Sequence, residues 1–189
     1  MLTAWGDLRG AMRAMLDARP SESTLLVFAL LSGVFQFLGR LAALTIGPEA
    51  GATSAEEMPS RLGAEFTSAI GLRTLGLYLV AWLVHAVCRA AGGTGAGRDS
   101  RAAVFWAALV AAPLLLLAEI VSFLIAPSVG SEAAEGLPFA AGIAFAWAAA
   151  ASIAEAHGFR STLRVLAALA APALVLFGVG LFLGSEAGG

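Results

Sequence analysis

Five apolar runs, each long enough to cross a bilayer, restrict what this chain can fold into. They are Thr24–Ile46, Phe66–Cys88, Ala102–Ala126, Leu137–Ala156 and Leu163–Leu183. A helix needs about 20 consecutive apolar residues to span the hydrocarbon core of a membrane. Each run therefore predicts a transmembrane helix. Together they predict an all-α fold, a polytopic membrane bundle of five helices.

The composition excludes several other classes of protein. Of the 189 residues, 59% are hydrophobic and 13% are charged, whereas a soluble domain has about 45–50% and about 25%. The net charge of −2 is too balanced for nucleic-acid binding. Cys88 is the only cysteine, so no intrachain disulfide can form. The complete lack of Lys and Asn indicates GC-rich coding and a bacterial source.

Arginine placement predicts the orientation of the bundle. With five spans, eight of the 11 arginines fall on one side of the membrane: Arg9, Arg13, Arg19, Arg89, Arg98, Arg101, Arg160 and Arg164. The other side has Arg61 among a group of glutamates. Because basic residues stay on the cytoplasmic side, the amino terminus should be cytoplasmic. The carboxyl terminus should be periplasmic, with the protein in the bacterial inner membrane.

Residues 1–20 have a pattern of their own. Large apolar residues recur at helical spacing, with arginines on the rest of the circumference. Such a short amphipathic helix can lie at the membrane interface. It would pack under the bundle or rest on lipid, or it would bind a partner. Residues 21–184 then form the membrane domain, and residues 185–189 form a short outside tail.

Small residues and prolines mark several spans. The fourth run is rich in alanine, which lets helices approach closely, and it is expected at the centre of the bundle. Gly180 and Gly184 form a small-residue motif that would suit a homo-oligomer. Pro113 and Pro172 stand in the middle of two spans. Each removes one backbone hydrogen bond and should produce a kink, a hinge or a polar pocket.

Ionisable residues inside spans are costly and suggest function. Arg40, Arg73 and Glu119 lie six or seven residues from the outer ends of three different spans. At 1.5 Å per residue they share one depth, about 9–11 Å below the outer boundary. Glu119 is expected to bridge one or both arginines as a structural clasp. Alternatively, the arginines extend to the outer headgroups, or the three residues bind an anion or a lipid headgroup.

A second polar set lies near the cytoplasmic ends of the second and fourth spans. His85 and Arg89 are one helical turn apart, and Glu155 and His157 end the fourth span. Capping and hydrogen bonds between helices are expected here. A metal pair or a proton relay is the alternative, because histidine is both a ligand and a titratable group.

Two segments resemble the Yip family of integral membrane proteins, named for their interaction with Ypt/Rab GTPases. One is the loop Gly-Gly-Thr-Gly-Ala-Gly-Arg, residues 92–98, which leads into a span with Ala-Ala-Pro113. The other runs from Trp147 to His157 and continues into Phe159-Arg160-Ser161. The similarity is to the bacterial branch and covers roughly residues 20–183. It implies the architecture rather than an activity, and it transfers no catalytic residue.

Two functions remain open. The chain contains no nucleophile elbow, zinc motif or phosphate-binding loop, so it is expected to be non-enzymatic, without cofactor or metal. The first hypothesis is a membrane scaffold, adaptor or accessory subunit that works through intramembrane contacts. Its partners would be membrane lipids and a membrane protein or a second copy, with no nucleic acid. The alternative is a small transporter, channel or lipid-handling protein that uses the polar residues within the membrane.

Overall fold

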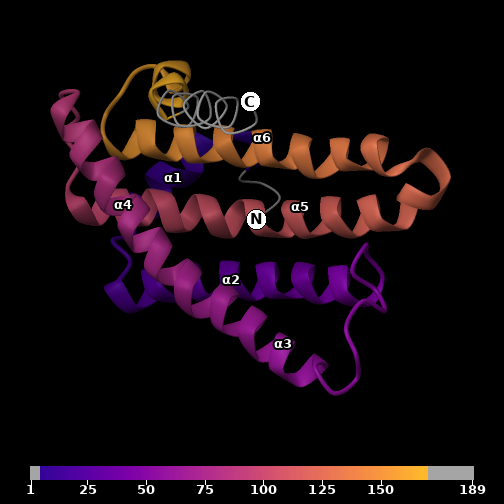
Figure 1. Cartoon of the computed structure of the whole chain (residues 1–189). Coiled ribbons are helices and arrows are strands. Elements are labelled where there is room, and N and C mark those ends of the chain that lie inside the picture. The colour runs from indigo at the N-terminus through magenta and orange to yellow at the C-terminus, as the bar shows by residue number, and fades with distance from the viewer. Residues whose placement is uncertain (1–4, 170–189) are drawn as a thin grey trace, which may run out of the picture.

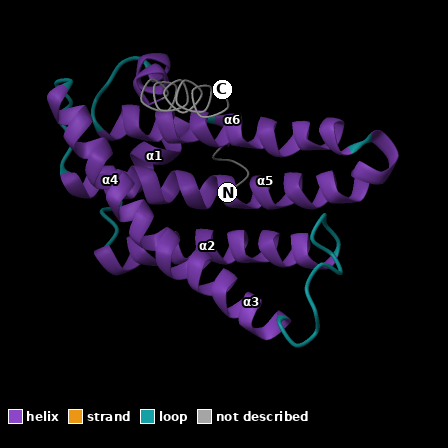
Figure 2. Cartoon of the chain, in the orientation of Figure 1, coloured by secondary structure: helices purple, strands orange, loops and turns teal. Residues whose placement is uncertain are grey.

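The computed structural model describes residues 5–169, and all regular secondary structure in that part is helical (Figure 2). The elements are α1 (Leu8–Asp17), α2 (Glu22–Thr45), α3 (Met58–Phe66), the π-helical η2 (Thr67–Leu72), α4 (Arg73–Ala90), α5 (Gly97–Val129) and α6 (Ser131–Ala156). A further helical stretch covers residues 162–169. The predicted all-α fold is therefore confirmed.

Four helices in the described part are long and apolar enough to cross a membrane. They are α2, the continuous helix Met58–Ala90, α5 and α6. The predicted fifth span begins in the stretch 162–169, and the rest of it lies outside the described residues. Pro172, Gly180, Gly184 and the tail 185–189 also lie outside them. The number of five spans thus stays a prediction.

Helix α5 lies at the centre of the bundle. It packs against α6, α2, α4 and α1, and Figure 1 shows α2, α5 and α6 side by side with α4 crossing them obliquely. The fourth apolar run forms α6, which packs on α5 and α1; its central position stays a prediction, because most of the predicted fifth span lies outside the described residues. Alanine covers the side of α6 that faces α5, but the outer side carries large residues such as Phe139, which is 72% exposed.

Helices α5 and α6 form a hairpin with a single residue between them. Gly130 makes the turn with φ of +88°, a conformation that glycine adopts without steric cost. The connection expected over residues 127–136 is otherwise helical. Pro127 lies in the last turn of α5, whereas Pro113 and Pro138 lie inside α5 and α6, which continue through them.

The second span begins earlier than the apolar pattern indicates. Its helix starts at Met58, with Pro59 in the first turn, where the missing N–H costs nothing. It then passes through the π-helical turn η2 into α4. Gly33 of α2 allows η2 to come close, since a Cβ at Gly33 would lie 2.5 Å from the carbonyl oxygen of Ala69. Glu65, expected in a loop, is therefore on a helix facing α2.

The eight arginines that were predicted to share one side gather at one end of the bundle. The first residues of α2 and α5 meet the last residues of α4 and α6 there, on the left of Figure 1. This is the arginine-rich end. The loop 46–57, the start of α3 and the α5–α6 turn lie at the opposite end (Figure 1).

Candidate functional site

Three helices bring polar side chains together at the arginine-rich end. The hydroxyl of Ser100, in the first turn of α5, lies 3.2 Å from Nδ1 of His85 on α4. The same hydroxyl lies 2.9 Å from Nε2 of His157, the residue that ends α6. A serine hydroxyl can donate to one imidazole and accept from the other. Ser100 therefore connects the two histidines, whose ring centres are 5.9 Å apart.

The glycine-rich loop between α4 and α5 covers His157. A Cβ on Gly93 would lie 2.8 Å from the carbonyl oxygen of Cys88 and 3.0 Å from Nδ1 of His157, and one on Gly95 would overlap the carbonyl oxygen of Ala156. The amide of Thr94 donates to the carbonyl oxygen of His157 over 3.1 Å. These glycines allow the loop to approach closely. The geometry thus explains the loop as a packing element over His157.

The imidazole of His157 is buried and is held in its neutral form. Its side chain is 1% exposed, and its Nδ1 has no hydrogen-bond partner within residues 5–169. Burial lowers the pKa of His157, and the nearby His85 and Arg89 lower it further, while Asp99 opposes them. Among the described residues, no three His, Cys, Asp or Glu side chains could hold a metal ion together.

The second predicted polar set therefore divides into three parts. His85 and His157 are joined, but through Ser100, which sequence reasoning did not select. Arg89 donates to the carbonyl oxygen of Gly93 over 3.3 Å and so supports the loop. Glu155 turns away from both histidines and pairs with α1. The position of Ser100, a polar residue just before an apolar run, was the available signal for its role.

Glu155 holds α1 against the bundle through two arginines. Its Oε2 accepts from Nε of Arg9 over 2.9 Å, and its Oε1 accepts from Nε of Arg13 over 2.7 Å. Although it is charged, the Glu155 side chain is only 11% exposed. The guanidinium of Arg9 also donates to the carbonyl oxygens of Phe159 and Arg160 over 2.9 and 3.1 Å. Arg9 therefore ties α1 to both α6 and the turn that follows it.

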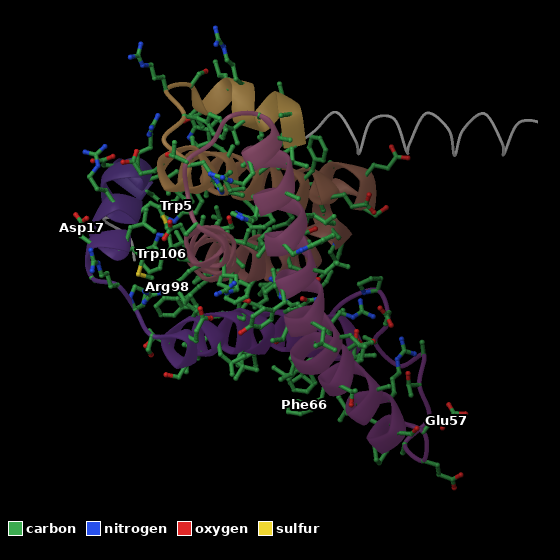
Figure 3. The ribbon with its side chains drawn as sticks, turned by 90° about the vertical axis from the view of Figure 1, so that its left-hand side faces the viewer. Trp5, Asp17, Glu57, Phe66, Arg98 and Trp106 are labelled. Atoms are coloured by element: carbon green, nitrogen blue, oxygen red, sulfur yellow. The ribbon has the colours of Figure 1, made fainter. Side chains whose placement is uncertain are left out.

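The apolar side of α1 packs on α5 and α6 rather than on lipid. Leu8 and Met12 are buried against these helices. Trp5, just before α1, packs on the same small cluster as Trp106 of α5, and Figure 3 shows the two indoles on this side of the bundle. Of the expectations for residues 1–20, packing against the bundle matches this arrangement.

The polar residues at the opposite end pair differently from the predicted clasp. Arg40 makes two hydrogen bonds with the carboxylate of Glu65, at 3.0 and 3.1 Å, and lies 3.2 Å from Glu49. Glu119 forms no ion pair with Arg40 or Arg73 in the described structure, and its carboxylate lies against Gly39. The reason is the early start of the second span, which places Glu65 where it reaches Arg40 first.

Arg73 is left without its predicted partner. It begins α4, directly after the π-helical turn, and its Nε is buried with no hydrogen-bond partner among residues 5–169. Arg40 belongs to a network of ion pairs with Glu65, Glu49 and Arg61. Arg73 and Glu119 form no ion pair with this network in the described structure.

The helical architecture and the long apolar helices define an integral membrane protein with several spans. The family model described as the Yip1 domain matches residues 8–183, and the chain belongs to that family. The matched region includes α1, the glycine-rich loop and the Ser100–His157 contact. No curated protein and no solved structure matches the sequence.

Replacing Glu155 tests the attachment of α1. Glu155→Gln removes the charge from both ion pairs and should lower stability by about 1 kcal/mol through the partly buried pair with Arg9. The purified protein should melt at a lower temperature, and trypsin should cleave at Arg13 faster. Glu135→Gln, an exposed change on the same helix, is the control and should change neither. Unchanged protection of α1 in Glu155→Gln would contradict the role of this carboxylate.

The buried His157 predicts how stability depends on pH. The unfolded chain binds a proton at this residue near pH 6.5, whereas the folded protein resists it, because burial lowers the pKa of His157. The unfolded state thus binds more protons in acid, and stability is lost as the pH falls below about 6.5.

Thermal melting at pH 7.5 and 5.5 measures this loss. The wild-type protein should melt at a lower temperature at pH 5.5, and His157→Gln should show a smaller difference between the two pH values. A wild-type melting temperature that stays constant or rises on acidification would show that His157 is not held neutral.

Proposed function

We propose that this Yip-family protein is a non-enzymatic membrane scaffold or adaptor that acts through contacts within the bilayer. The observation that carries the proposal is an unpacked face of α4. Leu72, the last residue of η2, and Leu75, Leu79 and Trp82 of α4 follow one another at spacings of three, four and three. All four are exposed, Leu75 by 68% and Trp82 by 64%. We refer to them as the lateral stripe.

The lateral stripe has the form of a surface for another helix. Residues at this spacing lie along one face of a helix, as in the seams of packed helices. The side of α4 that packs on its own bundle is the opposite one, with buried Thr74, Ala81 and Cys88. A second transmembrane helix could therefore pack along the stripe without displacing any contact of the bundle.

The interior of the bundle supports a scaffold more than a conduit. Side chains of Ala102, Ala103, Ala107, Ala108, Ala111, Ala148, Ala150, Ala151 and Ala154 are buried where α5 and α6 lie together. Close packing of small residues leaves little room for water. Apart from the loop 46–57, the connections between the elements α1 to α6 are short, as little as one residue between α5 and α6. Large partners would thus be met mainly within the membrane.

Arg73 favours a second candidate, a small transporter, channel or lipid-handling protein. A buried guanidinium nitrogen without a partner is costly in a membrane protein. An anion or a lipid headgroup would supply the missing acceptor. Glu119 lies beside Gly39 and near Arg40, and its carboxylate would remain available to interact with such a ligand. The absence of a protein partner at the lateral stripe would favour this second candidate.

We further propose that the arginine-rich end faces the cytoplasm of a bacterium and that the loop 46–57 faces the periplasm. The positive-inside rule supports this orientation, because eight of the 11 arginines belong to the arginine-rich end. The amino terminus would then be cytoplasmic.

A photoreactive residue at position 79 tests the scaffold proposal. Placed there in cells, it should crosslink to one membrane protein of defined mass, or to a second copy of this chain. The same residue at Ile143, which is exposed on the outer side of α6, is the matched control and should give lipid adducts only. Lipid adducts alone at both positions would refute the scaffold and favour the second candidate.

Single-cysteine variants test the orientation. In a Cys88→Ala background, a membrane-impermeant maleimide on intact cells should label Ala52→Cys fully and Ala18→Cys not at all. Both positions are exposed, one at each end of the bundle. Permeabilised cells should label both. The reverse pattern on intact cells would invert the proposed orientation.

A further inference from the structure

A groove of about 850 Å³ lies between α4 and the segment 158–169 at the arginine-rich end. One wall is the second half of α4, with apolar residues from Val80 to Ala91, and the other is the segment 158–169. The volume lies in the range of about 300–1,000 Å³ typical of ligand sites. The α4 residues from Val80 to Ala90 extend over about 15 Å along the helix axis. The groove is thus long, and its walls are mostly apolar.

Two arginines place positive charge in the lining of this groove. Arg160, Ser161 and Arg164 belong to its lining, and both arginines are exposed. Neither forms an ion pair with a carboxylate of residues 5–169. In contrast, Arg9 and Arg13 are paired with Glu155, and Arg101 is paired with Glu22. The charge of Arg160 and Arg164 is therefore available to a ligand.

We propose that this groove binds a glycerophospholipid with an anionic headgroup. The phosphate and headgroup would lie at Arg160 and Arg164, whose planar guanidinium groups suit phosphate oxygens. An acyl chain would lie along α4 between Val87 and Val80. A lipid fits better than a soluble anion because the walls are apolar and α4 exposes its outer side to the bilayer. The inference goes beyond the scaffold proposal and does not depend on it.

Helix α1 fixes the charged part of the groove. Arg9 donates to the carbonyl oxygens of Phe159 and Arg160, and Phe159 lines the groove. The ring of Phe159 also stacks on His157, with centres 6.1 Å apart. The turn that carries Arg160 is therefore held from two sides. This arrangement preforms the position of the headgroup rather than leaving it to a flexible loop.

Lipid binding to the purified protein tests the charge. Phosphatidylglycerol should bind more tightly than phosphatidylcholine and raise the melting temperature, as measured by native mass spectrometry and thermal shift in detergent. Arg160→Gln combined with Arg164→Gln should weaken the binding of phosphatidylglycerol by at least about tenfold, since each arginine contributes about 1 kcal/mol near anionic lipid. The binding of phosphatidylcholine to this double variant should be unchanged. Arg19→Gln, another exposed arginine of this end, should retain the preference.

A pair of bulky substitutions tests the groove itself. Ala168 lines the groove and Ala167 does not, and both are exposed on the same turn. Ala168→Trp should therefore exclude the acyl chain and lower phosphatidylglycerol binding about tenfold, whereas Ala167→Trp should bind as the wild type does.

Three results would overturn the proposal. They are equal binding of the two lipids to the wild-type protein, binding of phosphatidylglycerol that survives Ala168→Trp, and equally tight binding of glycerol 3-phosphate, which has no acyl chain. All are measured on the isolated protein. A missing partner at the lateral stripe would therefore not affect them.

Discussion

The close contact between α5 and α6 is the interaction on which the remaining helices depend. In a bilayer the hydrophobic effect does not draw helices together, since lipid tails are as apolar as the side chains. Association relies instead on dense packing, which small side chains permit. Alanine provides it along α5 and α6, and Gly130 closes the hairpin within one residue. Helices α1, α2 and α4 then pack on α5, while α3 and η2 pack on α2 and η2 also contacts α4.

Carboxylates attach α1 and α2 to that hairpin and join α3 to α2. Glu155 of α6 binds α1, Glu22 of α2 pairs with Arg101 of α5, and Glu65 of α3 pairs with Arg40 of α2. Each ion pair joins two elements that are distant along the chain. Ion pairs at partly buried positions contribute more than exposed ones, and they also specify which helix meets which. These three ion pairs therefore help to fix which helices pack together.

The apolar runs were sufficient to predict the class and the approximate spans, and the glycine-rich loop 92–98 with the segment 147–161 carried the family resemblance. They could not show that the second helix begins at Met58, because a polar first turn looks the same as a loop. For the same reason Glu65 was assigned to a connection, and the predicted partner of Arg40 was wrong. Alanine content could not show that α5 packs on α1, α2, α4 and α6, since that depends on all sides of the helix. Ser100 escaped because its two partners lie 15 and 57 residues away.

The arginine-rich end behaves as one connected unit rather than a row of separate charges. The glycine-rich loop packs on His157, which shares Ser100 with His85, and the ring of Phe159 stacks on His157. Arg9 holds the carbonyl oxygens of Phe159 and Arg160, and Glu155 holds Arg9. A change in α1 would therefore shift the turn that carries Arg160, and a change at His157 would shift it from the other side. If the groove binds a lipid as proposed, this shared turn would couple lipid binding to the attachment of α1, and such a coupling is reciprocal.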